Sequence, residues 1–204
     1  MRLIIAITGA SGVIYGIRIL EVLKGLKIET HLIITEWGAK NIKIETDSTL
    51  DYVKSLATRS YEDDNMAAPV SSGSFKVDGM IVIPCSTKTL ASIANALDDS
   101  LVSRAAGVCI KEQRKLVLVP RETPLSKIHL KNMTKLASTS AVILPAMPGF
   151  YHRPKTMDDL INHLVGKVLD QFNIEHSLFK RWGEGYQKEI RREENKNSQS
   201  YDTS

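Results

Sequence analysis

Residues 1–24 read MRLIIAITGASGVIYGIRILEVLK, and this stretch decides the fold class. Residues 3–7 form an apolar run that suits a buried strand, the segment around Gly9, Ser11 and Gly12 interrupts it, and apolar residues recur at helical spacing over 13–23. A helix N-terminus carries unpaired N–H groups and the positive end of a dipole, so an anion can bind there. The glycine spacing matches neither the dinucleotide fingerprint nor the P-loop. The turn is therefore either a phosphate site of another kind or a point of close packing.

The composition bounds the class of protein. With 204 residues, 43% hydrophobic and 25% charged, the chain suits one compact domain with a full core. No apolar stretch approaches the roughly 20 residues needed to span a bilayer, so we predict a cytoplasmic protein with no membrane partner. Cys85 and Cys109 form neither a disulfide framework nor a C-x-x-C pair. The net charge of +4 permits a nucleic-acid role, but basic residues gathered around a phosphorylated small ligand explain it equally well, and we predict no nucleic-acid partner.

Strand and helix patterns alternate along the whole chain. Further strands are predicted over 30–34, 79–83, 115–119 and 141–144. Helical patterns cover 39–45, 50–57, 90–97, 101–111, 126–136 and 157–172. Strands that alternate with helices, without hairpin signals, predict a single-domain Rossmann or flavodoxin-like α/β fold: a parallel sheet with helices on both faces. Ligands of such sheets bind at the carboxyl ends of the strands.

Small and polar residues follow all five predicted strands, in the segments TGASG, TEWGAK, PCSTKT, PRETP and PAMPGFYHRP. One edge of the sheet would thus receive hydroxyls, backbone N–H groups and the side chains of Lys88, Arg121, Glu122 and Tyr151. Hydroxyl-rich loops beside an arginine suit a mononucleotide phosphate with a flat ring next to it. The alternative is that Ser86, Thr87 and Thr89 only cap the helix that follows them.

Seven segments, in this order, resemble those of one known family: TGASGVIYG, ETD, PCSTKTL, RAAGVCIKE, LVLVPRETPLSKIHLKNM, ILPAMPGFYHRP and RWGE. Together they are similar to the flavin prenyltransferases, the UbiX-like or Pad-type proteins. The segments VSSGSF and ETPLSKIHL look closest to the proteins that are encoded alongside phenolic acid or 4-hydroxybenzoate decarboxylases, as the second subunit of those systems. The resemblance covers residues 1–184 as one flavin-binding domain, and it leaves 185–204 as a charged, polar tail that we expect to be flexible.

The resemblance implies an activity. Such proteins join the dimethylallyl group of dimethylallyl phosphate to N5 of reduced FMN and close a fourth ring through C6. The product, prenylated FMN, serves a separate UbiD-like aromatic acid decarboxylase. The resemblance also implies a homo-oligomer, a dodecamer, in which neighbouring subunits wall the site.

Residue roles carry over with the matching motifs. FMN would be contacted by Gly9, Ala10, Ser11, Thr35, Ser86, Thr87, Lys88, Thr89 and Arg121. Dimethylallyl phosphate would be contacted by Arg104, Lys111, Tyr151 and Lys167. The resemblance implies catalytic roles for Ser11, Glu45, Lys111 and Glu122, with Glu45 and Ser11 handling a proton at N5 and Glu122 a proton near the phosphate.

The chemistry explains why basic residues are needed. Cleavage of the allylic C–O bond leaves negative charge on the departing phosphate, and charged hydrogen bonds of about 1.5–3 kcal/mol each can stabilise it. No Asp pair in the chain is followed by a third Asp at D-D-x-x-D spacing, and the five histidines lack metal-ligand spacing. We therefore predict a site without metal.

Each assignment has an alternative. Glu45 and Glu122 could be solvated surface carboxylates, Arg104 and Lys111 a charged rim of one helix, and Tyr151 a core aromatic. The whole protein could instead be a flavin-dependent decarboxylase of the same fold, or a non-catalytic FMN-binding accessory subunit of a decarboxylase.

Two positions depart from the family pattern. Many members have a tryptophan where this chain has Asn65, and an arginine where Lys167 stands. Lysine keeps the charge of arginine but loses its two-pronged hydrogen bonding. We expect both departures to bear on the substrate pocket.

Overall fold

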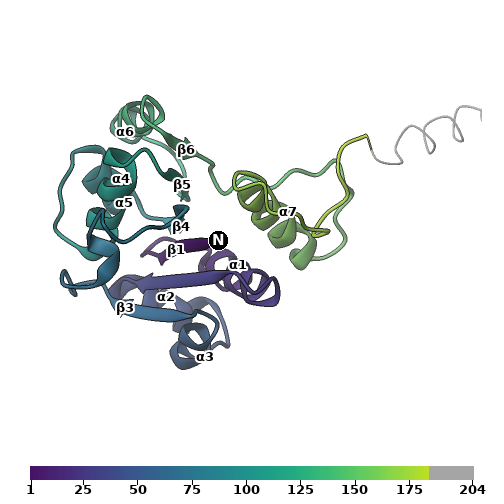
Figure 1. Ribbon diagram of the computed structural model, residues 1–204. Helices are drawn as coiled ribbons and strands as arrows, with labels where there is room; N and C mark the ends of the chain where they lie inside the picture. Colours follow the sequence, from purple (N-terminus) through teal and green to yellow (C-terminus); the bar gives the residue numbers. More distant parts are fainter. Residues whose placement is uncertain (184–204) are drawn as a thin grey trace, which may run out of the picture.

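A six-stranded parallel sheet forms the centre of the molecule (Figure 1). The computed structural model describes residues 1–183, so the predicted tail 185–204 and the last residue of the predicted domain lie outside the described residues. The strands are β1 Arg2–Ile7, β2 Glu29–Ile34, β3 Arg59–Glu62, β4 Gly79–Cys85, β5 Lys115–Pro120 and β6 Ala141–Ile143. Their order is β3-β2-β1-β4-β5-β6, the Rossmann-type order, in which the direction of winding reverses between β1 and β4. The predicted doubly wound α/β fold is confirmed.

Helices cover both faces of the sheet (Figure 1). They are α1 Val13–Gly25, α2 Glu36–Glu45, α3 Leu50–Ser55, α4 Thr87–Ala94, α5 Leu101–Lys111, α6 Lys127–Ala137 and α7 Met157–Asp170, with a 3-10 turn η1 at Pro69–Ser71. Leu3, Ile5 and Ile7 pack with α1, α2, α3 and α7, whereas Ile4 and Ala6 pack with α4, α5 and α6. Because alternate residues of a strand face opposite ways, the single apolar run of β1 serves both cores.

Two differences from the predicted elements have physical causes. Strand β3 has no apolar run, because it is a mostly exposed edge strand, and the sequence patterns did not predict it. Helix α4 begins at Thr87 rather than at residue 90, because the Ser86 hydroxyl accepts a hydrogen bond from Thr89 N and starts the helix earlier. The remaining predicted strands and helices differ from the observed bounds by three residues or fewer.

Candidate active site

Thr8 connects the loop after β1 to the loop after β4, where the winding of the sheet reverses. Its side chain is fully buried, and its Oγ1 donates to Pro84 O at 2.8 Å and accepts from Ser86 N at 2.8 Å. The loop after β1 is thereby held against the loop after β4. Thr8 begins the segment TGASG but is not among the predicted site residues, although its place directly after an apolar strand was a usable signal.

A cavity of about 350 Å³ opens between these loops and the end of β2. Six residues predicted to contact FMN line it: Gly9, Thr35, Ser86, Thr87, Lys88 and Thr89. A second hollow of about 670 Å³ adjoins it and shares Thr35 and Lys88. Thr35 is also the N-cap of α2, and Ser86 is the N-cap of α4. The same two residues therefore cap helices and line the cavity. Several hydroxyls and the ammonium of Lys88 can donate to a phosphorylated ligand such as FMN, and the carboxylates of Glu36, Asp63 and Asp99 line the same space.

Trp37 forms one wall of the cavity and was not predicted. The residue is 60% exposed, and Lys40 Nζ lies 4.4 Å from the centre of its ring. A Cβ at Gly9 would come within 2.5 Å of Trp37 Cβ, so only glycine permits this close approach. An exposed aromatic surface beside the hydroxyls supplies a flat, apolar contact for a ring system.

Glu45, the last residue of α2, closes the N-terminus of α1. Its Oε2 accepts from Gly12 N at 2.8 Å and from Val13 N at 3.3 Å. The helix terminus that the sequence marked as a possible phosphate site thus binds a carboxylate of the same chain. Both bonds involve one carboxylate oxygen, and Gly12 is the residue next to Ser11, so Glu45 lies close in the fold to the first turn.

Arg121 lies beside Ser11 at the first turn, and Glu122 does not. Arg121 Nε donates to Ser11 O at 3.4 Å, which places the guanidinium beside the first turn. The Glu122 side chain is exposed and accepts a hydrogen bond from Thr123 N at 2.9 Å. Within one chain Glu122 has the surroundings of a surface carboxylate.

Asp63 is a further cavity residue that the sequence patterns missed. It directly follows β3, and its Oδ1 accepts from Val102 N at 3.0 Å at the start of α5. Because β3 was not predicted, nothing in the sequence indicated that Asp63 stands at a strand end. Asp99 and Ser100 line the same cavity from the segment before α5.

Arg104 and Lys111, the two α5 residues predicted to bind the phosphate, make their contacts away from the cavity of their own chain. Arg104 donates to Ser71 O at 3.0 Å and pairs with Asp98 at 2.8 Å. Lys111 pairs with Glu112 at 2.6 Å at the last turn of α5. Since Ser100 at the start of α5 lines the cavity and an 11-residue helix is about 16 Å long, Lys111 lies at the opposite edge of the sheet.

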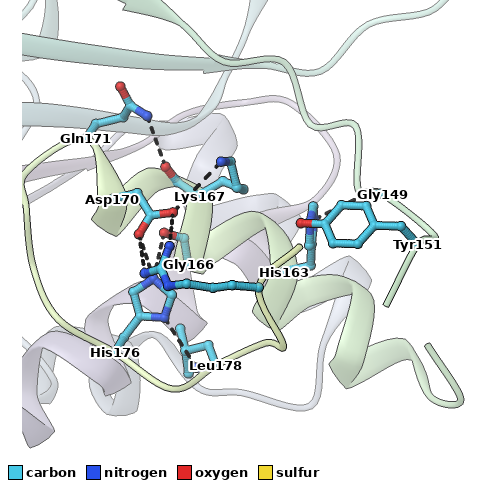
Figure 2. A network of polar contacts seen from close by, with 10 residues as sticks. Gly149, Tyr151, His163, Gly166, Lys167, Asp170, Gln171, His176 and Leu178 are labelled. Atoms are coloured by element: carbon cyan, nitrogen blue, oxygen red, sulfur yellow. Dashed lines mark hydrogen bonds and ion pairs between the residues drawn. The ribbon is translucent and has the colours of Figure 1, made fainter. Parts of the chain in front are cut away.

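Lys167 lies in α7, and Tyr151 lies in the loop before it and contacts the helix (Figure 2). The Tyr151 hydroxyl lies 3.0 Å from Nε2 of His163, one helical turn before Lys167, and the Lys167 ammonium lies 3.8 Å from Asp170. Burial alone would raise the pKa of Asp170, but hydrogen bonds and charge from Arg181, together with His176, lower it overall. The carboxylate of Asp170 therefore stays charged and holds the end of the described chain against α7.

The two cysteines carry no nucleophilic chemistry. Cys85 borders the cavity loop, but burial raises its pKa to about 12, and burial does the same for Cys109. Both thiols therefore stay protonated at neutral pH, as expected of small core residues.

Comparison with known proteins agrees with this geometry. A family model described as Flavoprotein matches residues 1–169, so the chain is an α/β flavoprotein. It is 52% identical over 181 residues to the mitochondrial flavin prenyltransferase PAD1 of Saccharomyces cerevisiae, covering 89% of this chain and 75% of that protein. It is 47% identical over 182 residues to the flavin prenyltransferase UbiX of Thermoplasma acidophilum, covering 89% and 100%. The chain belongs to the UbiX-like flavin prenyltransferase family.

Two solved structures share both fold and sequence. AnUbiX (PadA1), in complex with FMN and dimethylallyl pyrophosphate, superposes with a TM-score of 0.88 at 49% identity, covering 89% of this chain and 97% of that one. A dodecameric FMN-dependent UbiX-like decarboxylase from Escherichia coli O157:H7 gives the same TM-score and identity, covering 89% and 99%. The peptidyl-cysteine decarboxylase EpiD, at 19% identity and a TM-score of 0.58, shares the fold alone.

Proposed function

We propose that this chain is a flavin prenyltransferase, which joins the dimethylallyl group of dimethylallyl phosphate to N5 and C6 of reduced FMN and supplies prenylated FMN to a UbiD-like aromatic acid decarboxylase. The observation that carries the proposal is the cavity between the ends of β1, β2 and β4, lined by Gly9, Thr35 and residues 86–89. The relatives named as flavin prenyltransferases, and the neighbour solved with FMN and dimethylallyl pyrophosphate, support it.

The cavity residues are assigned to flavin binding. The hydroxyls of Thr35 and Thr89 and the ammonium of Lys88 would hold the phosphate and sugar-alcohol oxygens, and Trp37 would cover the ring system. Ala10, Ser11 and Arg121 would close the same edge, since Arg121 contacts the Ser11 carbonyl. When bound, reduced FMN supplies the electron-rich nitrogen and carbon that accept the allyl group.

Glu45 is assigned to proton transfer. Its Oε2 is held by the amides of Gly12 and Val13, which fixes the carboxylate beside Ser11. Among residues 1–183, Oε1 has no hydrogen-bond partner, so it can accept the proton released from the flavin nitrogen. Glu122 is assigned to a proton near the phosphate, on the strength of its place beside Arg121.

The departing phosphate is assigned to Arg104, Lys111, Arg121, Tyr151 and Lys167. As the allylic C–O bond breaks, its electron pair stays with phosphate, and the positive charges stabilise the growing negative charge. Lys111 lies at the far end of α5 from the cavity of its own chain, so we assign it to the site of a neighbouring copy. The dodecameric relative supports the assignment of this chain to a homo-dodecamer.

No helix among residues 1–183 is long and apolar enough to cross a membrane. We assign the protein to the cytoplasm on the grounds of its sequence, whereas the yeast relative is named as mitochondrial. Fractionation of the producing cell tests this assignment.

One incubation tests the activity. Under anaerobic conditions, the chain with reduced FMN and dimethylallyl phosphate should yield a flavin heavier by one prenyl unit in mass analysis. An unchanged flavin mass, with FMN bound, would contradict the proposal and favour the accessory-subunit alternative.

A further inference from the structure

The ammonium of Lys111 is held by Glu112 over the backbone of Gly73. Lys111 Nζ donates to Glu112 Oε1 at 2.6 Å. A Cβ added at Gly73 would lie 2.6 Å from Glu112 Oε1 and 3.1 Å from Lys111 Nζ, so both charged ends occupy the space that any other side chain would fill. Adjacent residues of a helix point to different sides, so these two side chains meet only because both bend toward one point. The ion pair therefore rests on a backbone segment that is distant in sequence.

The segment that carries Gly73 is itself fixed to α5 and to the residues after this helix. Arg104 Nε, in α5, donates to Ser71 O at 3.0 Å. Arg114 donates with Nη2 to Gly73 O at 2.6 Å and with Nη1 to Phe75 O at 2.9 Å. A planar guanidinium that binds two carbonyls sets the position of the backbone between them. Gly73 is thus a fixed support for the ion pair.

The stability of α5 does not account for Glu112. This residue is the C-cap of the helix, where the partial negative charge of the helix end disfavours a carboxylate, whereas it favours Lys111 in the last turn. Exposed ion pairs in general add little to stability. The hydrogen bond and the charge of Lys111 lower the pKa of Glu112, so the carboxylate stays ionised at neutral pH. Its consequence is therefore for the position of Lys111 rather than for the helix.

The ion pair leaves the Lys111 ammonium accessible to a ligand. An ammonium has three hydrogens, and among residues 1–183 Glu112 accepts one of them. The Lys111 side chain is 55% exposed, so a second copy of the chain can reach its ammonium. Two hydrogens can thus be donated to phosphate oxygens, from a point that the contact with Glu112 sets.

We propose that Glu112 and Gly73 are positioning residues, which hold the Lys111 ammonium in the place from which it contacts the departing phosphate in a neighbouring copy. The inference rests on the proposed function, because it takes the role of Lys111 from there. A lysine side chain in solvent populates many rotamers, and a lysine fixed in advance does not lose this entropy when it binds the phosphate. A small displacement of such a group costs a large factor in rate.

Three substitutions separate the position of the ammonium from its surrounding charge. Glu112→Ala removes the partner of Lys111, whereas Glu112→Gln keeps an acceptor oxygen and removes only the charge. Gly73→Ala displaces the ion pair, and the fold should tolerate it, because the displaced atoms are the ends of flexible side chains. Gly25→Ala and Glu21→Ala are the matched controls, since a Cβ at Gly25 meets nothing within 4 Å and Glu21 belongs to another ion pair on a helix surface.

We expect Glu112→Ala and Gly73→Ala each to lower the single-turnover rate of prenyl transfer about tenfold. The dissociation constant of dimethylallyl phosphate, measured by calorimetry with oxidised FMN bound, should change less than about threefold, because Lys111 acts mainly as the phosphate departs. Glu112→Gln should keep the rate within about threefold. In the Lys111→Met background neither alanine variant should add a further loss. Melting temperature and sedimentation should match those of the two controls.

Three kinetic outcomes would overturn the proposal. An unchanged or faster rate in Glu112→Ala would show that this carboxylate only offsets the charge of Lys111. A loss in Glu112→Gln as large as that in Glu112→Ala would show that charge, not contact, matters. Losses that add to that of Lys111→Met would show an effect on the fold.

Crystal structures give a readout that does not depend on activity. In the unsubstituted chain the Lys111 ammonium should be ordered beside Glu112, and in Gly73→Ala it should be displaced from this position. The same ammonium position in both structures would overturn the inference. Failure of the unsubstituted chain to prenylate flavin would instead contradict the proposed function, so the two failures are distinguishable.

Discussion

The flavin side and the phosphate side of the proposed site are built in different ways. Gly9, Thr35 and residues 86–89 come from three strand ends that the parallel sheet places side by side, and Thr8 locks two of their loops together. Lys111 and Tyr151 lie instead on α5 and beside α7, two helices on opposite faces of the sheet. In the proposed function one chain therefore supplies the flavin side, whereas the phosphate side combines residues from more than one copy.

This difference has a physical origin. In a doubly wound sheet the strand direction forces every strand end to the same edge, so residues just after the strands converge whatever their order in sequence. Helices run back the other way, and a residue in the last turn of a helix is carried to the opposite edge. We therefore propose that Lys111 acts at the cavity of another subunit, which would make the assembly part of the site.

The largest expected effect tests the half that one chain completes. Glu45→Gln should leave FMN bound, since the amide oxygen still accepts from Gly12 and Val13, but it should lower prenyl transfer about 10²–10⁴-fold by removing a proton acceptor. Single-turnover mass analysis of the flavin measures the rate. Asp47→Asn, two residues further on, is the matched control, and unaltered turnover in Glu45→Gln would make Glu45 a surface carboxylate.

The next effect tests the half that needs two chains. Lys111→Met should lower the transfer rate about 10²–10³-fold with little change in flavin affinity, because the lost charge stabilises the departing phosphate. Co-expressing Lys111→Met chains with Glu45→Gln chains should restore about a quarter of the activity, because a quarter of the sites then combine both intact residues from different copies. No recovery in the mixed assembly would show that both residues act in the same chain.

A smaller effect concerns the packing beneath the cavity. A Cβ at Gly16 would lie 2.5 Å from Ile83 O and 2.7 Å from Ile7 Cγ1, so Gly16→Ala should push α1 away from the ends of β1 and β4. We expect a loss of about 1–3 kcal/mol in unfolding free energy, measured by denaturant titration, together with weaker FMN binding. Gly25→Ala is the control, because nothing lies within 4 Å of its added Cβ, and equal stability of both variants would contradict this account.

The last prediction is that removal of divalent metal ions does not change the prenyl transfer rate. Because the predicted phosphate site supplies its own positive charge, addition of a chelator should leave the prenyl transfer rate intact in the assay used for the proposed function. Restoration of a chelator-inhibited rate by magnesium would show that the basic residues have been assigned wrongly.

The sequence alone determined the periodic part of the fold and most of the flavin edge. Apolar runs and helical spacing predicted five of the six strands and all seven α-helices, because both patterns are local. The polar segments after those strands predicted that the loops carrying Gly9, Thr35 and residues 86–89 meet at one edge of the sheet, since strand direction carries that information without any detail of packing. The resemblance to the flavin prenyltransferases then gave these residues as FMN contacts.

Only the tertiary structure decided which distant residues meet. Strand β3 lacks an apolar run, so it forms only by pairing with β2. This pairing also determines the position of Asp63, which directly follows β3 and lines the cavity. The contact of Glu45 with α1, of Trp37 with Gly9, and of His163 with Tyr151 joins side chains whose spacing follows no local period. Local patterns encode elements, whereas such contacts arise only when the elements pack, which is why the contact between His163 and Tyr151 could not be predicted from the sequence.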